Sequence, residues 1–191
     1  MPTTNAALVD RANLRAGVDA ALGRHVARLR AEAERISPDA GPLVDAVERM
    51  IAGGKRLRAA FCYWSWRAHG GVPGDEREQA VLRAGAALEL FQAAALFHDD
   101  VMDDSSTRRG LPTAHQVFAA EHEMAQHAPE RLLFGDGVAI LLGDLALIAS
   151  DEEMSGALAE APAPVARAAR AVFATMRTEV TIGQYLDLVA Q

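Results

Sequence analysis

The chain has 191 residues, 50% of them hydrophobic but only 5% aromatic, and a formal net charge of −7 at pH 7. This length is enough for one domain with a sizeable core, or for a large part of a bigger domain. The negative charge argues against a general nucleic-acid-binding protein, because such proteins present a basic surface. An anionic ligand must therefore be held by a local basic cluster or by metal ions.

Two further features predict the compartment. Cys62 is the only cysteine, so an intrachain disulfide is excluded. No apolar run approaches the length that crosses a bilayer, and arginines interrupt residues 1–30 where a signal peptide would need an apolar core. We therefore expect a soluble, cytoplasmic protein without a transmembrane segment.

Apolar residues recur at helical spacing along most of the chain, and prolines fall between the periodic segments. The predicted helices cover about residues 9–36, 42–53, 56–69, 76–104, 112–125, 135–155 and 162–190. The segment 76–104 is apolar on nearly every face from Ala84 to Phe97, which predicts a central, buried helix. No strand-like alternation of useful length is present. The expected fold class is all-α.

An acidic run ends this central helix. Asp99 and Asp103 are four residues apart, so on a helix their carboxylates project from one face about one turn apart, with Asp100 and Asp104 beside them. Such crowding of like charge destabilises a bare helix, and hard divalent cations with oxygen ligands relieve it. Mg²⁺ typically uses one or two carboxylates and completes its shell with water and phosphate oxygens. The plainer alternative is a solvated helix end.

Two basic clusters accompany the acidic run. Arg108 and Arg109 follow it directly, and arginine forks match phosphate oxygens, although these two could also merely neutralise the aspartates. The other cluster, Gly53-Gly54-Lys55-Arg56-Leu57-Arg58, contains the only lysine of the chain. Its glycines let the backbone approach an anion at a helix start. Together the clusters predict a site for two diphosphates and a hydrocarbon chain.

These stretches resemble the trans-isoprenyl (polyprenyl) diphosphate synthase family. The resemblance rests on the Gly-Gly-Lys-Arg-Leu-Arg cluster, on Phe97 to Asp104 with its DDxxD pattern, on Arg108-Arg109-Gly110 with Pro112 and His115, and on Gly183-Gln184-Tyr185-Leu186-Asp187. It implies an isoprenoid-synthase-type helical bundle around a central cavity. Residues 1–191 would form the N-terminal part of a single synthase domain, with a leading helix in 1–40 and the family motifs in 41–191.

The resemblance also implies residue roles. Asp99, Asp100 and Asp103 would be catalytic, with Asp99 and Asp103 binding Mg²⁺ and Asp100 supporting them. Lys55, Arg58 and Arg109 would hold the diphosphate of isopentenyl diphosphate, and Arg108 would contact the allylic diphosphate. The family often has a histidine seven residues before the motif, where this chain has Gln92, whose neutral amide can still donate to a diphosphate oxygen.

The implied reaction is Mg²⁺-dependent head-to-tail (1′-4) condensation of isopentenyl diphosphate with an allylic diphosphate, by a protein that forms homodimers. The small residues Ala94 and Ala95 are expected to face down the cavity, so that the growing chain reaches Phe91, about 12 Å below Asp99. This favours a C20 product. Ala94→Phe is the substitution expected to shorten it.

The family's second aspartate-rich motif does not occur in these 191 residues. Asp151-Glu152-Glu153 is interpreted as a solvated face. The chain is therefore expected to be a fragment that is weakly active or inactive by itself. Three alternatives stay open. A helical scaffold without a small-molecule site would leave residues 99–109 unexplained. A class I terpene cyclase would not need the Gly-Gly-Lys-Arg-Leu-Arg cluster, and a non-catalytic partner subunit would be expected to lose the aspartates.

Overall fold

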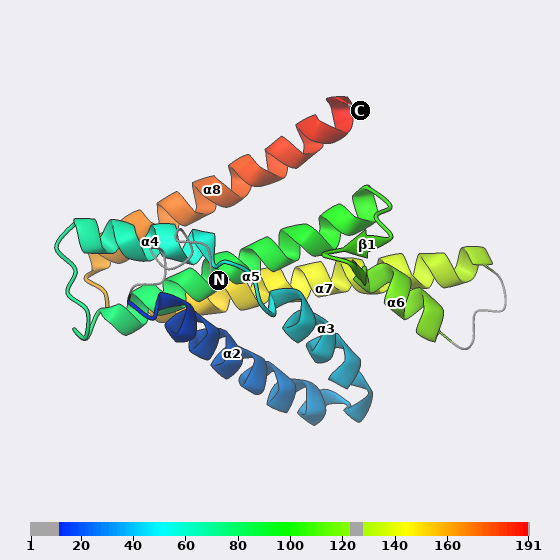
Figure 1. Ribbon diagram of the computed structural model, residues 1–191, viewed down its shortest axis with the longest axis horizontal. Coiled ribbons are helices and arrows are strands. Elements are labelled where there is room, and N and C mark those ends of the chain that lie inside the picture. Colours follow the sequence, from blue (N-terminus) through cyan, green and yellow to red (C-terminus); the bar gives the residue numbers. More distant parts are fainter. Residues whose placement is uncertain (1–11, 123–127, 191) are drawn as a thin grey trace, which may run out of the picture.

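A computed structural model describes residues 12–122 and 128–190. Most of these residues lie in helices, with one short hairpin between α5 and α6 (Figure 1). In chain order the elements are α2 (Leu14–Ile36), the 3₁₀ turn η1 (Pro38–Ala40), α3 (Gly41–Ile51), α4 (Leu57–Ala68), α5 (Glu78–Met102), β1 (Thr107–Arg108), β2 (Leu111–Pro112), α6 (Ala114–Glu121), α7 (Ala128–Ala157) and α8 (Ala163–Ala190). The prediction of an all-α fold is confirmed.

Helix α5 is the centre of the bundle, as its apolar sequence predicts. It packs along α7 and also contacts α2, α3, α4 and α6 (Figure 1). Both helices carry fully buried alanines, Ala86 and Ala94 on α5 and Ala139 and Ala146 on α7. Small side chains on both helices allow their axes to approach closely. The packing against α7 therefore fixes the position of α5, including the end that carries the aspartates.

The predicted helix boundaries differ from the observed ones mainly at their ends. Residues 9–11 of the first predicted helix and 123–125 of the predicted helix 112–125 lie outside the described residues. Helix α7 begins at Ala128, earlier than predicted, and α5 ends at Met102 rather than at Asp104. The antiparallel hairpin β1–β2 was not predicted, because two-residue strands are too short to show an alternating pattern.

The interpretation of the acidic cluster 151–153 as a solvated face is wrong for Glu153. Asp151 and Glu152 are exposed, but Glu153 is 1% exposed. Because α7 continues to Ala157, position 153 faces α2 and α5 rather than solvent. Its carboxylate accepts hydrogen bonds from His25 Nδ1 at 3.0 Å, from Arg83 Nε at 2.8 Å and from Arg28. A buried carboxylate is stable only with such partners, and this one joins three helices.

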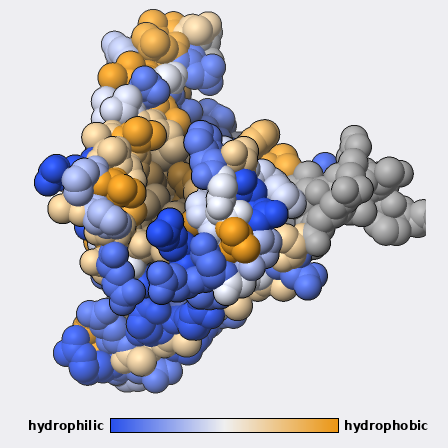
Figure 2. Space-filling view, turned by 90° about the vertical axis from the view of Figure 1, so that its left-hand side faces the viewer, coloured by the Kyte–Doolittle hydropathy of each residue, from blue (hydrophilic) through white to orange (hydrophobic). Residues whose placement is uncertain are grey.

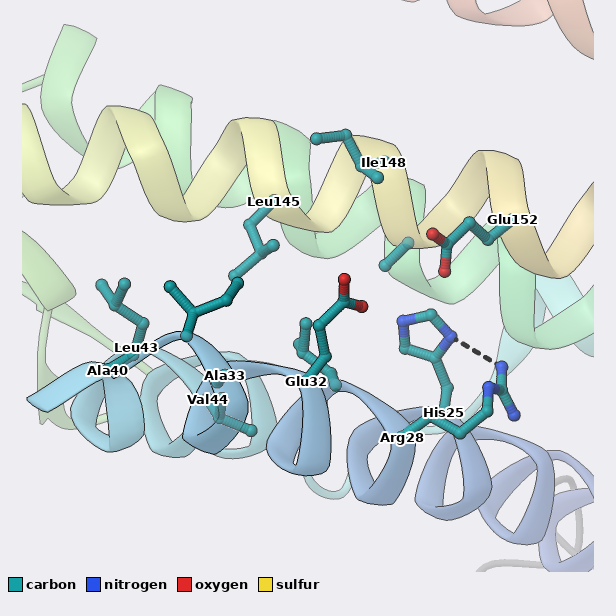
Figure 3. A pocket seen from close by; sticks show the side chains of 13 residues that line it. His25, Arg28, Glu32, Ala33, Ala40, Leu43, Val44, Leu145, Ile148 and Glu152 are labelled. Carbon is teal, nitrogen blue, oxygen red and sulfur yellow. Dashed lines mark hydrogen bonds between the residues drawn. The ribbon is translucent and has the colours of Figure 1, made fainter. Parts of the chain in front are cut away.

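A pocket of about 500 Å³ opens beside this cluster between α2, α3 and α7 (Figure 3). His25 and Glu32 extend into it from α2, and Leu145 and Glu152 from α7 (Figure 3). The Glu153 cluster contacts Arg83 near the start of α5, whereas the aspartates lie at the end of this helix. We therefore assign the cluster a role in the stability of the fold.

The statement that no apolar run approaches the length of a bilayer span is wrong. By length and composition, α5 and residues 130–157 of α7 are each long and apolar enough to cross a membrane. Half of the apolar window of α5 is buried in the bundle, as in the core helix of a globular domain. That the protein is cytoplasmic and does not span a membrane stays a prediction.

Helix α8 is the least covered helix of the described residues. Phe173 is its one buried residue, and Arg177 joins it to Asp151 of α7 at 3.2 Å. Its second half makes few contacts with the other helices (Figure 1) and carries exposed apolar residues such as Ile182 and Tyr185. Figure 2 shows apolar residues gathered at the top of the molecule, where α8 ends, and a mostly hydrophilic surface below, over α2 and α3.

Candidate functional site

The four predicted aspartates lie where α5 ends, but they are not equivalent. Asp99 and Asp100 belong to the last turn of α5, Asp103 follows the helix, and Asp104 has a left-handed backbone with φ 49°. Aspartate tolerates that conformation better than most residues. Asp100 is 1% exposed, whereas Asp103 and Asp104 are exposed. Asp99 and Asp103 therefore offer carboxylates at the surface, and Asp100 turns into the protein.

Arg108 joins both of the helical aspartates. Its Nε donates to Asp100 Oδ1 at 2.6 Å and its Nη2 donates to Asp99 Oδ2 at 3.0 Å. The hairpin fixes this position, since Arg109 and Gly110 form a two-residue loop with φ 54° and 79°, the pattern of a type I′ turn. Burial raises the pKa of Asp100, although the Arg108 guanidinium acts in the opposite direction. In this structure Arg108 neutralises the aspartates, which is one of the two roles that the sequence allowed for it.

A third group reaches the aspartates from α8. Gln184 Nε2 donates to Asp99 Oδ1 at 2.9 Å, across 85 residues of sequence. Both oxygens of Asp99 are thus engaged, one by Arg108 and one by Gln184. Neutral and cationic donors already compensate this carboxylate, as expected for a site with an excess of negative charge.

The Gly53–Arg58 loop presents its cations outward. Gly53 and Gly54 have φ 70° and 85°, and Lys55 and Arg58 are exposed. Arg56 behaves differently: it is 7% exposed and donates to the Ile51 carbonyl at 2.7 Å, with an ion pair to Asp19 at 2.7 Å. Arg56 therefore anchors the loop and leaves its neighbours free to meet an anion.

Arg109 connects the two basic clusters. Its Nη1 lies 3.5 Å from the carbonyl oxygen of Ala52, the residue before Gly53. A pocket of about 340 Å³ lies beside it between α3, α5, the hairpin and α6, and Arg108 and Asp100 also line this pocket. The structure thus brings together Arg109 and the Lys55 loop, which are more than 50 residues apart in sequence.

The α5 face below Asp99 leads to a groove between α5, α7 and α8. This groove, of about 430 Å³, is lined by Phe91, Leu147 and a stripe of α8 that includes Ile182. Ala95 is half-buried and lies four residues from both Phe91 and Asp99, on the same helix face. Ala94 instead points into the main hydrophobic core and is fully buried. Of the two alanines, Ala95 is therefore the one that lies on the helix face between Asp99 and the groove. We call this face of α5 the path from Asp99 to Phe91.

Gln92 is half-buried on α5, and its role stays a prediction. As for metal binding, the described part of the chain holds no cluster of three or more His, Cys, Asp or Glu side chains with ligand geometry. The donor set still fits Mg²⁺, because two carboxylates one turn apart at a solvent-facing helix end match what this ion takes from a protein.

Comparison with known proteins agrees with this geometry. The family model described as polyprenyl synthetase matches residues 42–191. The chain belongs to the polyprenyl synthetase family. A short-chain isoprenyl diphosphate synthase of Methanothermobacter thermautotrophicus is 32% identical over 162 residues, which cover 84% of this chain and 42% of that protein. A geranylgeranyl diphosphate synthase of Sulfolobus acidocaldarius is 32% identical over 154 residues, covering 80% and 40%.

A solved structure shows the same fold. The geranylgeranyl pyrophosphate synthase of Corynebacterium glutamicum, complexed with isoprenyl diphosphate and magnesium, superposes with a TM-score of 0.78 at 31% identity. The match covers 93% of this chain and 51% of that one. The chain thus spans about half the length of these polyprenyl synthetase relatives, and the expected isoprenoid-synthase-type helical fold is confirmed.

Sequence reasoning missed two residues that contact this polyprenyl synthetase site. Gln184 lies within a recognised motif, but its 85-residue separation from Asp99 hides the contact. Arg56 stands in the sequence as one member of a cationic cluster, and only its burial reveals an anchoring role. Arg56 follows Gly53-Gly54-Lys55 and precedes a helix. Nothing in this sequence distinguishes an arginine that anchors the loop from one that binds an anion.

Proposed function

We propose that the chain forms the metal- and diphosphate-binding side of a prenyltransferase site. The reaction is Mg²⁺-dependent head-to-tail (1′-4) condensation of isopentenyl diphosphate with an allylic diphosphate. The observation that carries the proposal is the position of the Asp99 and Asp103 carboxylates between two basic clusters, above an apolar groove. The names of the relatives, which are isoprenyl and geranylgeranyl diphosphate synthases, support the same reaction.

The proposed roles follow from position and charge. Asp99 and Asp103 hold Mg²⁺, which when bound draws charge onto the leaving diphosphate. Lys55, Arg58 and Arg109 hold the diphosphate of isopentenyl diphosphate. The allylic C–O bond breaks, the isopentenyl double bond attacks the allylic carbon, and a proton is lost. Apolar side chains along the groove exclude water from the cationic centre.

Three further groups support this chemistry in the proposal. Asp100 keeps Arg108 beside the metal ligands through the 2.6 Å hydrogen bond. With Mg²⁺ held by Asp99, Arg108 Nη2 would be free to donate to an oxygen of the allylic diphosphate. Gln92 donates its amide to a diphosphate oxygen. The proposed enzyme is a homodimer, and the exposed residues Leu133, Leu141 and Ile148 form an apolar stripe on α7 suited to a helical interface.

The proposal includes a second requirement. The 191 residues carry one DDxxD pattern, while the condensation needs a second acidic motif across the cavity. We therefore propose that this chain binds substrates but turns them over weakly when it acts alone.

Calorimetry of the 191-residue chain tests the proposed function. Geranyl diphosphate should bind with Mg²⁺ and at least about tenfold more weakly with EDTA, because without the ion the aspartate carboxylates and the diphosphate would repel each other. Geraniol is the control without a diphosphate. Isopentenyl diphosphate should also bind, which a terpene cyclase has no reason to do. Equal affinity with and without Mg²⁺ in a folded sample would refute the proposal.

The groove below Asp99 leads to a prediction about chain length. Ala95→Phe should weaken the binding of geranylgeranyl diphosphate by about tenfold, because an aromatic ring at this position blocks the path to Phe91 at a cost of about 1–3 kcal/mol. Dimethylallyl diphosphate, which is too short to pass Ala95, should bind with unchanged affinity. On the basis of this path we propose a C20 product.

The matched control is Leu96→Phe, which introduces the same ring one residue further along the helix, turned away by about 100°. Leu96 is half-buried, as Ala95 is. Calorimetric titrations with C5, C10, C15 and C20 diphosphates compare both variants. If Ala95→Phe leaves the C20 affinity unchanged, or if Leu96→Phe produces the same length dependence, the growing chain does not follow this face of α5.

A further inference from the structure

The buried carboxylate of Asp100 has an unused oxygen. Its Oδ1 accepts the hydrogen bond from Arg108, but its Oδ2 is buried and has no hydrogen-bond partner. Asp100 itself is 1% exposed. A buried acceptor left without a donor costs about 1–3 kcal/mol, so native proteins rarely leave one in place.

His115 is a second buried side chain with unused polar atoms. It lies in the first turn of α6, is 2% exposed, and both of its ring nitrogens are buried without a partner. Among the described residues four buried side-chain atoms lack a partner, and three of them belong to Asp100 and His115. Burial raises the pKa of the Asp100 carboxyl, Arg108 opposes the rise, and His115 is near enough to oppose it as well.

The position of His115 is fixed from two sides. Thr113, which precedes α6, donates through Oγ1 to the Ser105 carbonyl at 2.8 Å and so ties the start of the helix to the hairpin. On the other side α6 lies directly on α7 at Gly135, where an added Cβ would come within 2.2 Å of the His115 carbonyl oxygen. The 340 Å³ pocket beside the start of α6 is lined by Asp100, Thr113 and Ala114, so Asp100 and the residues just before His115 border the same space.

We propose that His115 is a positioning residue of the aspartate motif. One of its ring nitrogens donates a hydrogen bond to Asp100 Oδ2, directly or through one buried water. This bond fixes the plane of the Asp100 carboxylate, which holds Arg108 next to Asp99. The role in catalysis rests on the proposed function, whereas the hydrogen bond itself does not.

A double-mutant cycle on the folded chain without ligand tests the bond. His115→Leu, Asp100→Asn and the double variant are unfolded in urea, and the unfolding constants are compared. We expect a coupling of about tenfold between the two positions, which corresponds to about 1.4 kcal/mol. If His115 only fills space, His115→Leu removes two unpaired nitrogens and stabilises the fold whether or not Asp100 is present. That result overturns the proposal.

Binding of inorganic diphosphate with Mg²⁺ tests the positioning role. His115→Leu should weaken it by about tenfold, the lower end of what loss of a supporting group costs at a metal site, and His115→Gln should restore most of the affinity because its amide can donate to Asp100. The control is His122→Ala, which removes the stacking of His122 on Phe134 at the other end of α6 and should leave binding unchanged. Unchanged binding by His115→Leu overturns the positioning role.

The Arg108 Nε–H resonance in ¹⁵N NMR spectra separates this proposal from the proposed function. The signal should be protected from exchange in the wild type and in His115→Gln, and exposed in His115→Leu. If wild-type protein fails to bind diphosphate, the proposed function is wrong, and the coupling and this resonance still decide the His115 bond. If the resonance is unchanged in His115→Leu, His115 does not position Arg108.

Discussion

Asp103→Asn should abolish the Mg²⁺-dependent part of diphosphate binding, with a loss of affinity of about 100-fold or more. The amide keeps the shape of the side chain but removes the charge and one oxygen ligand. Asp103 is exposed, so the loss reports on metal binding rather than on folding. Calorimetric titration of geranyl diphosphate at several Mg²⁺ concentrations measures it.

Asp99→Asn should have the same effect on binding and an additional one on structure. Asp99 accepts hydrogen bonds from Arg108 and Gln184, and its loss weakens both contacts. Asp45→Asn is the matched control, because Asp45 is an exposed carboxylate paired with Arg30 of α2 rather than with the aspartate motif, and its removal changes net charge equally. Retained Mg²⁺ dependence in Asp103→Asn would show that the aspartates do not share an ion.

Acid should destabilise the protein through Glu153 in a defined range of pH. Burial by itself would raise the pKa of Glu153, but hydrogen bonds from His25, Arg83 and Arg28 outweigh it and lower the pKa to about 2, from an ordinary value of 4.5. A lowered pKa in the folded state contributes stability above pH 4.5, and this contribution is lost as the pH falls toward 2. The shift corresponds to about 3 kcal/mol.

Glu153→Gln should therefore lower the free energy of unfolding by about 3 kcal/mol at pH 7, and the difference from the wild type should shrink as the pH approaches 2. Urea unfolding at a series of pH values measures both quantities. Glu152→Gln, a change of the exposed neighbour, should cost less than about 0.5 kcal/mol. If the two variants are equally stable, or if the cost of Glu153→Gln is independent of pH, the buried carboxylate does not tie the helices together.

Much of the fold was predictable because it depends on local periodicity. The apolar segment 76–104 predicted a central helix, and α5 occupies that place. The partners of the aspartates were harder to predict, since they come from distant segments: Gln184 lies 85 residues from Asp99, and His115, the partner proposed for Asp100, lies on another helix. Sequence spacing identifies residues that share a helix face, but not the face that a second helix presents to them.

The same limit explains the error at Glu153. Three acidic residues in a row are usually solvated, and Asp151 and Glu152 are. One residue further along the helix turns by about 100°, which moves the third carboxylate from solvent into the bundle. The signal that could have revealed it lies on other helices, in His25, Arg28 and Arg83, and no local pattern connects these residues to position 153.

The tie between His25 and Glu153 spans 128 residues, and this separation affects how the chain is assembled during synthesis. When the ribosome has made α2 to α5, the side chains of His25, Arg28 and Arg83 are already present. The Glu153 carboxylate that pairs with all three has not yet been synthesised. The contacts that join α2 and α5 to α7 can therefore form only after α7 has been translated. Contacts of such long range form late because loop closure opposes them.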